Sequence, residues 1–306
     1  MVRMYDKTFF DSAIVSAKNA KISVMSSAVL YGLSVYTVFP VCVTKNGPAA
    51  FRVKDHFKRL VDSARIIGID TFEQQWTEEK FIETVRQLII ANAIKKDVFV
   101  RATVHVNELL PGTRSRGLAT AVSMFAYDAS AILSENGVRL KTSVWRRVPD
   151  YAIPSRAKVN GAYVNSVLAK QDALDSGYDD CIFLDAAGQV CELSAANIFI
   201  VRNGVLITPG TSNDILEGVS RRTVIELAPD MNVPVIERTI DLTELYIADE
   251  VFASGTSAFI ASVKEIDKRI IANGEVGPIT LFLQKKYRDI LHGADLHYKH
   301  LLTILK

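Results

Sequence analysis

Three residues near the middle of the sequence, Lys158, Tyr163 and Glu192, have side chains that could carry out chemistry. Lys158 stands among small and apolar residues, between Ala157 and Val159. In such surroundings an amine can lose its proton near neutral pH and act as a nucleophile that forms an imine with a carbonyl. Most lysines are solvated surface groups, so the residue type alone does not assign this role.

The elements around these residues narrow the interpretation. Residues 164–174 form a helix-like run, and residues 179–192 have the pattern of a strand, a turn at Gly188 and a second strand. Glu192 therefore comes from a predicted hairpin and not from an exposed helix. Another predicted strand follows at residues 197–201.

The lysine segment and the segment from Glu192 to Phe199 closely resemble the class IV (fold type IV) pyridoxal-phosphate aminotransferases, which include branched-chain and D-amino-acid aminotransferases. The glutamate segment fits the family pattern Glu-x-x-x-x-Asn-x-Phe, and the resemblance covers nearly the whole chain. It implies that pyridoxal 5'-phosphate is the cofactor and that Lys158 binds it covalently and later moves a proton. Glu192 would face the pyridine nitrogen and favour its protonated form, and Tyr163 would donate to the phenolic oxygen.

The resemblance also implies a set of phosphate ligands. Arg59 lies in a His-x-x-Arg-Leu segment of a predicted helix, and a planar guanidinium suits bidentate phosphate contact. Gly218 precedes another predicted helix, whose first backbone N–H groups form an anion site. The implied cofactor ligands in this part of the chain are Val219, Ser220 and Thr256, and Ser257 and Ala258 would lie by the substrate carboxylate.

The substrate side departs from the branched-chain pattern. Relatives have Tyr-Gly-x-x-x-Phe-Glu-Gly-Ile-Arg, whereas this chain keeps only the start, Tyr31-Gly32, and places Tyr36 and Val38 in the strand that lines the pocket. Relatives carry Tyr-x-Arg farther on, where this chain has Phe99 and Arg101. The resemblance implies that Arg101 helps to bind the substrate α-carboxylate.

These differences leave alternatives open. Tyr31 and Arg101 favour a branched-chain L-amino acid as donor with 2-oxoglutarate as acceptor. The altered residues 37–40 and Phe99 favour an (R)-selective amine transaminase or a D-amino-acid transaminase. An aminodeoxychorismate lyase on the same fold would use the same Lys158. In a non-catalytic cofactor-binding or ligand-binding protein, that lysine would only be part of the scaffold.

The length of 306 residues is enough for two domains with a core each. The resemblance implies an α+β fold made of two α/β domains, that of a fold type IV enzyme. We expect a small N-terminal domain of a sheet and helices at residues 1–124, a connection at 125–133, and a larger barrel-like domain at 134–306 that carries the cofactor lysine. Predicted strands lie at residues 22–24, 28–44, 49–53, 97–106, 118–125 and 138–148, and predicted helices at 55–67, 77–93 and 278–290. Asp55 is placed to cap or lead the first of these helices.

The composition is that of an ordinary globular protein, with 49% hydrophobic and 23% charged residues. A net charge of +2 gives no electrostatic footprint for nucleic acid. Residues 23–44 carry no charge over the length of a membrane span, but their polar and β-branched residues favour strands. We therefore expect no nucleic-acid or membrane partner. The resemblance implies a small-molecule amino donor and a 2-oxo acid acceptor.

The three cysteines have no metal-ligand spacing and are typical of reduced thiols in a cytoplasmic protein. The histidines His292, His297 and His300 also lack a ligand pattern, so the sequence predicts no metal site. The N-terminus has no apolar signal-peptide core. Relatives assemble as homodimers or larger oligomers, and the resemblance implies the same here.

Overall fold

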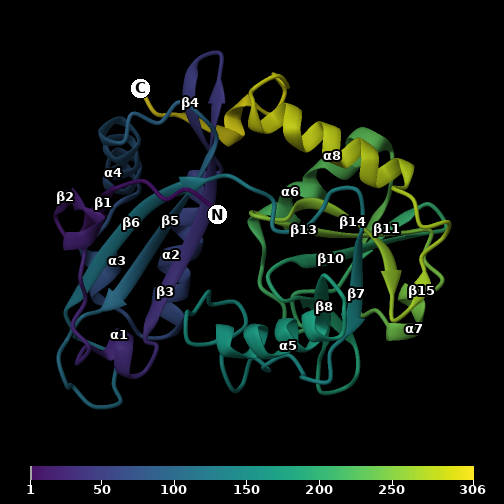
Figure 1. Ribbon diagram of the computed structural model, residues 1–306, viewed down its shortest axis with the longest axis horizontal. Helices are drawn as coiled ribbons and strands as arrows, with labels where there is room; N and C mark the ends of the chain where they lie inside the picture. The colour runs from purple at the N-terminus through teal and green to yellow at the C-terminus, as the bar shows by residue number, and fades with distance from the viewer. Residues whose placement is uncertain (1) are drawn as a thin grey trace. The chain divides into compact units, whose positions relative to one another are not determined.

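The computed structural model describes residues 2–306, and the chain divides into two compact units (Figure 1). The first unit contains the residues up to Ser130, the short segment Ala157–Ala162 and the stretch Asp289–Lys306. The second unit contains Ala131–Arg156 and Tyr163–Arg288. Both units therefore combine segments that are far apart in the sequence.

The first unit is built on a seven-stranded antiparallel sheet with the strand order β16-β4-β3-β5-β6-β1-β2. Its longest strand, β3, is buried from Ser34 to Cys42, which explains why this stretch has no charged residue. The strands are β1 (Lys7–Phe10), β2 (Ala13–Ser16), β3 (Ser34–Thr44), β4 (Gly47–Phe51), β5 (Val98–Val106), β6 (Thr120–Asp128) and β16 (Leu302–Ile304).

Helix α2 (Val53–Ile66) packs against β3 in the first unit, as Figure 1 shows. Its buried residues Val53, Phe57, Leu60 and Ala64 recur at helical spacing and join the core of this unit. The other helices are α1 (Ser27–Leu30), α3 (Thr71–Gln75) and α4 (Glu78–Ala91), with the 3-10 turns η1 (Ala17–Asn19) and η3 (Lys299–Leu301).

The second unit contains a nine-stranded sheet that closes on itself. Strands β10, β13, β14, β7, β8 and β9 follow one another in the pairing order, and β9 pairs back to β10 through Glu192 and Asn197. The ring strands are β7 (Val138–Thr142), β8 (Asp180–Leu184), β9 (Val190–Leu193), β10 (Asn197–Arg202), β13 (Glu250–Gly255) and β14 (Phe259–Ile266). Strands β11 (Val205–Thr208), β12 (Val235–Glu237) and β15 (Arg269–Ile270) extend it.

Helices of the second unit position several of the predicted site residues. Helix α5 (Tyr163–Asp175) begins at Tyr163, and α6 (Val219–Leu227) begins at Val219. The remaining helices are α7 (Leu242–Leu245), α8 (Pro278–Leu291) and the 3-10 turn η2 (Ala228–Met231). The last residues of α8, from Asp289 on, are counted with the first unit.

The predicted α+β class and the barrel-like second sheet are confirmed. Three element predictions are wrong. Residues 22–24 form no strand, and Ser27–Leu30 is a helical turn, since Tyr31 N donates to Ser27 O over 3.0 Å. The strand predicted at 138–148 ends at Thr142, because Ser143 Oγ accepts from Trp145 N over 3.0 Å and turns the backbone.

The predicted role of Asp55 as a helix cap is also wrong. Helix α2 is preceded by Arg52, which has a left-handed φ of 49° and makes no side-chain cap. Asp55 instead lies in the first turn and accepts from Arg52 Nε over 2.7 Å. A carboxylate in the first turn still complements the helix dipole. Over residues 2–306, none of the helices is long and apolar enough to cross a membrane.

Candidate active site

The backbone around Lys158 is fixed against β3 and α2 of the first unit. Tyr36 N donates to Lys158 O over 3.0 Å, and Lys158 N donates to Ser63 Oγ of α2 over 3.1 Å. Two residues later, Asn160 N donates to Ser34 O over 2.9 Å. The Lys158 Nζ atom lies 4.9 Å from the centroid of the Tyr36 ring. The lysine is thus held by its main chain beside a predicted substrate residue.

A close approach of two glycines fixes the Tyr31-Gly32 motif next to the lysine segment. Gly32 has a left-handed φ of 65°, and a Cβ there would lie 2.9 Å from Gly161 Cα. Any residue other than glycine would be strained and would also clash. Tyr31, at the end of α1, is 48% exposed. Glycine at position 32 of the Tyr31-Gly32 motif is therefore explained by packing against Gly161 within the first unit.

Four predicted substrate residues share one face of the β3–β5 pair. Val38 is opposite Arg101 and Pro40 is opposite Phe99, so Val38, Phe99 and Arg101 point the same way, as does Tyr36 two residues before Val38. The Arg101 guanidinium lies 3.7 Å from the Tyr36 ring centroid and donates to Asn160 Oδ1. A guanidinium held by an aromatic ring and an amide is suited to bind a carboxylate.

His105 lies farther along β5 and contributes no second positive charge near neutral pH. Its ring nitrogen Nε2 is 2.9 Å from Ser123 Oγ. Burial, and to a lesser degree the charge of Arg101, lowers the pKa of His105 to about 4. The neutral imidazole leaves Arg101 as the cation that this part of the strand presents.

Arg59 lies on the α2 side of the sheet. Its Nη2 donates to Thr37 Oγ1 over 3.3 Å, and Thr37 Oγ1 is also 2.8 Å from His56 Nδ1. Because strand side chains alternate, Thr37 faces away from Tyr36 and Val38. His56 is 1% exposed, so its imidazole is buried between α2 and β3. Thr37, one of the residues that differ from the branched-chain pattern, therefore contacts Arg59 of α2 and does not lie on the sheet face that carries Arg101.

In the second unit, the carboxylate of Glu192 is buried and accepts hydrogen bonds from several donors. It is 6% exposed on β9, and its two carboxylate oxygens accept from Arg147 Nη2 over 2.9 Å, Asn197 Nδ2 over 3.0 Å and Leu216 N over 3.2 Å. A buried carboxylate with a guanidinium and two amide donors is stabilised as the anion. Its orientation is fixed by the same contacts.

The start of α6 places Val219 and Ser220 in a buried first turn. Amides in a first turn have no acceptor within the helix and favour an anion. A Cβ at Gly218 would lie 2.1 Å from Asn197 Oδ1, so glycine is required before this helix. Ser220 Oγ lies 3.0 Å from Tyr287 Oη. Asn197 thus connects the glutamate to the beginning of α6.

The remaining predicted residues lie at two other places in the second unit. Thr256, Ser257 and Ala258 form the turn between β13 and β14, where Gly255 pairs with Phe259. Ile132 N donates to Ser257 O over 2.9 Å, which fixes this turn. Tyr163, the first residue of α5, is half-buried.

Sequence reasoning missed two residues that hold Glu192. Asn197 was part of the recognised pattern, but its bonds to Glu192 Oε2 and to Leu216 O were not expected. Arg147 had no signal, because it follows the irregular end of β7. Its Nε donates to Asp214 O over 3.2 Å, which holds the guanidinium toward Glu192.

The donor set fits pyridoxal phosphate. The first unit offers an amine for a carbonyl carbon and guanidinium groups for anions, in Lys158, Arg59 and Arg101. The second unit offers a fixed anionic carboxylate for a ring nitrogen, in Glu192, and a helix beginning for a phosphate, at Val219 and Ser220.

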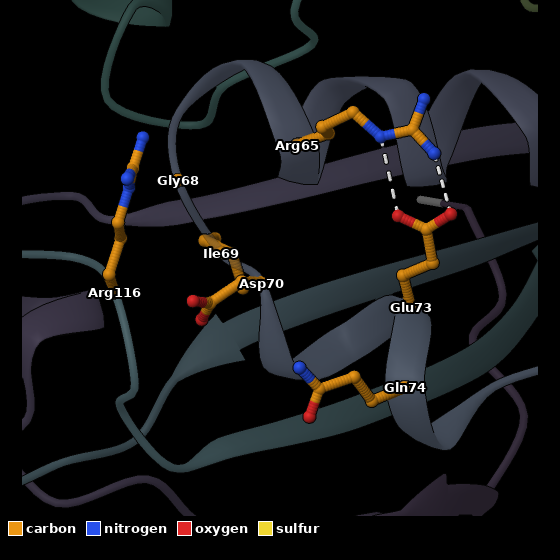
Figure 2. A pocket seen from close by; sticks show the side chains of 7 residues that line it. All are labelled: Arg65, Gly68, Ile69, Asp70, Glu73, Gln74 and Arg116. Carbon is orange, nitrogen blue, oxygen red and sulfur yellow. Dashed lines mark hydrogen bonds and ion pairs between the residues drawn. The ribbon is translucent and has the colours of Figure 1, made fainter.

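A separate surface pocket of the first unit, with a volume of about 410 Å³, contains none of the predicted site residues. Figure 2 shows Arg116 across this pocket from Arg65 and Glu73, whose side chains form two hydrogen bonds of 2.5 and 3.3 Å. Both partners are more than half exposed. The charges of Arg65 and Glu73 on this side of the pocket therefore compensate one another.

Comparisons with known proteins agree on one family. The sequence matches the family model described as amino-transferase class IV over residues 35–266. It is 39% identical over 302 residues to a probable branched-chain-amino-acid aminotransferase of Aquifex aeolicus (strain VF5), covering 97% of this chain and 96% of that protein.

Solved structures extend the agreement to the fold. The branched-chain aminotransferase from the archaeon Thermoproteus uzoniensis with norvaline is 37% identical and has a TM-score of 0.94, covering 99% of this chain and 100% of that chain. The branched-chain amino acid aminotransferase from Thermobaculum terrenum in its PLP-form is 29% identical and has a TM-score of 0.92, covering 99% of each chain. The similarity thus spans nearly the full length of each protein.

Proposed function

Because the chain belongs to the class IV aminotransferases, which depend on pyridoxal phosphate, we propose that it moves the amino group of a branched-chain L-amino acid to a 2-oxo acid. The transfer runs as two half-reactions, in which the donor leaves its nitrogen behind and departs before the acceptor takes it up. The observation that carries the proposal is the buried Glu192 carboxylate with its three donors, in a chain that also supplies Lys158.

Lys158 and Glu192 divide the chemistry between them. Bound pyridoxal phosphate supplies a carbonyl for the amino group and a ring that accepts the electron pair released at the substrate Cα. Lys158 Nζ holds the cofactor between turnovers, and then removes a proton from the substrate Cα and returns one to the cofactor. Glu192 keeps the pyridine nitrogen protonated, and Arg147 keeps the carboxylate ionised.

The other predicted cofactor residues have the chemistry of phosphate and phenol ligands. Arg59 in the first unit, and Val219, Ser220 and Thr256 in the second, are proposed to bind the phosphate. Tyr163 is proposed to donate to the phenolic oxygen. Support comes from the first turn of α6, whose amides favour an anion.

Substrate binding is proposed for the face of β3 and β5 that carries Arg101. Arg101 binds a carboxylate, while the apolar side chains Val38 and Phe99 and the aromatic ring of Tyr36 contact the aliphatic part of the donor. Tyr31, Ser257 and Ala258 complete the proposed set. A mostly apolar surface with one guanidinium is suited to a branched side chain next to a carboxylate.

A specific observation favours a second candidate, an (R)-amine or D-amino-acid transaminase. Phe99 lacks the hydroxyl that branched-chain relatives place here, and its 1% exposed ring lies 5.7 Å from the Tyr127 ring, centroid to centroid. An altered pocket of this kind changes the stereochemistry and the size of the amino donor that it accepts.

The test is an absorbance spectrum of the purified holo-protein mixed separately with L-leucine, D-alanine and (R)-1-phenylethylamine. We expect L-leucine alone to convert the visible band of the lysine-bound cofactor to the aminated form. Conversion only by D-alanine or by the amine would replace the branched-chain proposal with the second candidate. In Lys158→Ala we expect neither the band nor turnover, and persistence of both would refute the mechanism.

A homodimeric state and a cytoplasmic location are further parts of the proposal. Helix α5 exposes four apolar side chains, Val164, Val167, Leu168 and Leu174, which support an interface with a second copy. The three cysteines are free and buried, and burial raises the pKa of each thiol, to about 12 for Cys42. Free, buried thiols without a disulfide partner among the described residues support a reducing compartment.

A further inference from the structure

Three potential metal ligands meet in the first unit, and none of them is among the residues proposed for transamination. Cys42 comes from β3, Asp97 directly precedes β5, and His292 directly follows α8. One ligand atom of each lies within 4.8 Å of the other two. Asp97 and His292 are 195 residues apart in sequence, so only the fold brings them together.

The contacts within this cluster orient the ligand atoms. Asp97 Oδ1 accepts from Val43 N over 2.8 Å, so the β3 backbone fixes the carboxylate. The other oxygen, Oδ2, lies 2.8 Å from His292 Nε2. Cys42 is 3% exposed, whereas the side chains of Asp97 and His292 are 35% and 46% exposed. The cluster thus has a buried sulfur end and a solvent-facing imidazole end.

We propose that Cys42, Asp97 and His292 bind a divalent transition-metal ion of the zinc class. Sulfur, imidazole nitrogen and carboxylate oxygen are the ligand types of zinc sites, and an open fourth position goes to water. Around a tetrahedral ion these atoms lie about 3.5 Å apart. The present separations, all within 4.8 Å, therefore need only small adjustments when metal binds, and the 2.8 Å contact of Asp97 with His292 lengthens. The metal replaces the thiol proton, which leaves to solvent.

The surroundings provide an outer shell for such a site. The Val43 N–H bond to Asp97 is of the kind that orients metal-bound carboxylates. Asp97 also lines an open surface pocket of about 450 Å³ together with Lys96, Asp128 and Ala129, which gives an ion and its water a path. Within this wall, Asp128 Oδ1 is buried and has no hydrogen-bond partner among the described residues.

The site would fasten the last stretch of the chain to the sheet of the first unit. His292 begins the segment that leads to β16, whereas Cys42 lies in β3 and Asp97 directly precedes β5, two strands at the middle of the sheet. No residue proposed for cofactor or substrate binding takes part. Failure of this proposal is therefore distinct from failure of the proposed transaminase function.

The test is a Co²⁺ titration of the full-length holo-protein without a histidine tag. Cobalt replaces zinc in such sites, and its visible ligand-field bands and thiolate charge-transfer absorbance report a cysteine ligand. We expect saturation at one ion per chain, competition by Zn²⁺, and a higher melting temperature in Zn²⁺ because the ion binds only the folded chain. Absence of stoichiometric binding would overturn the proposal.

Matched variants assign the ligands. We expect His292→Ala and Cys42→Ser to weaken Co²⁺ binding by at least about tenfold, and Cys42→Ser to lose the thiolate absorbance. His300→Ala, an exposed histidine of the same terminal stretch, is the control and keeps binding unchanged. Binding that survives in His292→Ala, or a thiolate signal that survives in Cys42→Ser, contradicts the site. Circular dichroism confirms that each variant is folded.

Discussion

At the scale of single residues, the central feature is the way Glu192 is held. Its carboxylate is placed by Arg147, Asn197 and the Leu216 amide, and these come from three different stretches of the second unit. Such a group is oriented before any ligand arrives, so little reorganisation is needed when charge develops opposite it.

Glu192→Gln tests this role with little change in size. Glutamine keeps an oxygen for Asn197 but loses the charge opposite Arg147. We expect the cofactor to stay bound and turnover to fall by about 100-fold or more, because a neutral amide cannot stabilise the pyridinium. Cofactor content is read from the visible spectrum and turnover from single half-reactions with L-leucine.

A control removes a charge elsewhere without touching this network. Glu217, whose side chain is 51% exposed, pairs with Arg156 over 2.9 Å, and Glu217→Gln should keep near-normal turnover. Rates in Glu192→Gln that match the control would reject the electron-sink role.

The sequence points to single residues where a short motif carries them. Lys158 and Glu192 were predicted because the segments around them are continuous patterns. Arg147 was missed because it lies 45 residues from Glu192 and next to an irregular strand end. The Cys42–Asp97–His292 cluster was missed for the same reason, since its members are joined only by tertiary packing.

At the scale of elements, the start of α6 depends on the first residue of β10, Asn197. Gly218 has φ −67° and ψ 134°, a conformation that alanine also adopts. The requirement for glycine is therefore purely steric, from the 2.1 Å approach of a Cβ to Asn197 Oδ1. Asn197 cannot retreat without giving up its bonds to Glu192 and Leu216.

Gly218→Ala should accordingly damage two parts of the site with one methyl group. We expect a loss of about 1–3 kcal/mol in the free energy of unfolding, from overpacking, together with weaker retention of the cofactor. Denaturant unfolding and dialysis against cofactor-free buffer measure the two effects.

Gly210→Ala is the matched control, because its Cβ would meet only Asn213 Oδ1 at 3.4 Å and Ser212 Oγ at 3.9 Å. These are ordinary contact distances, so stability and cofactor retention should stay close to those of the parent chain. Equal behaviour of the two glycine variants would contradict the steric argument.

Elements were predictable from sequence where one periodic pattern dominated. Helix α2 was expected at residues 55–67 and occurs at Val53–Ile66, since its apolar spacing is strong. The first part of the uncharged stretch was not predicted correctly. Residues 27–30 are apolar enough for a strand, yet they form one helical turn. Just before this turn, Ser23 Oγ accepts from Met25 N over 3.2 Å, and a serine side chain that bonds nearby backbone favours a turn over a strand.

At the scale of the whole molecule, the proposed dimer predicts a mass in solution twice that of the chain. Light scattering at low micromolar concentration measures it. Val167→Glu, at a 63% exposed position of α5, should shift the protein toward monomer because a charge would be buried at the interface.

Ala186→Glu adds the same charge in an exposed hairpin turn and should leave the mass unchanged. A monomeric parent protein would contradict the dimer, and a dimer in Val167→Glu would remove α5 from its interface.

The organisation of the chain into units was the hardest feature to predict. The predicted boundaries at residues 124 and 134 assume that each domain is one continuous segment of the sequence. They remain a prediction. In the structure, the first unit also contains the segments Ala157–Ala162 and Asp289–Lys306, because strand pairing and packing act between residues far apart in sequence. Only the strand patterns were visible beforehand, not their partners.

The pairing of β16 with β4 has a consequence for how the protein is made. Phe51 of β4 pairs with Leu302 of β16, so this edge of β4 stays unpaired until about 250 further residues have left the ribosome. At about 5–20 residues per second, that wait is roughly 10–50 s. During this time the nascent chain carries an open strand edge that can pair with other chains. The first sheet therefore stays open at this edge until Leu302–Ile304 have been synthesised.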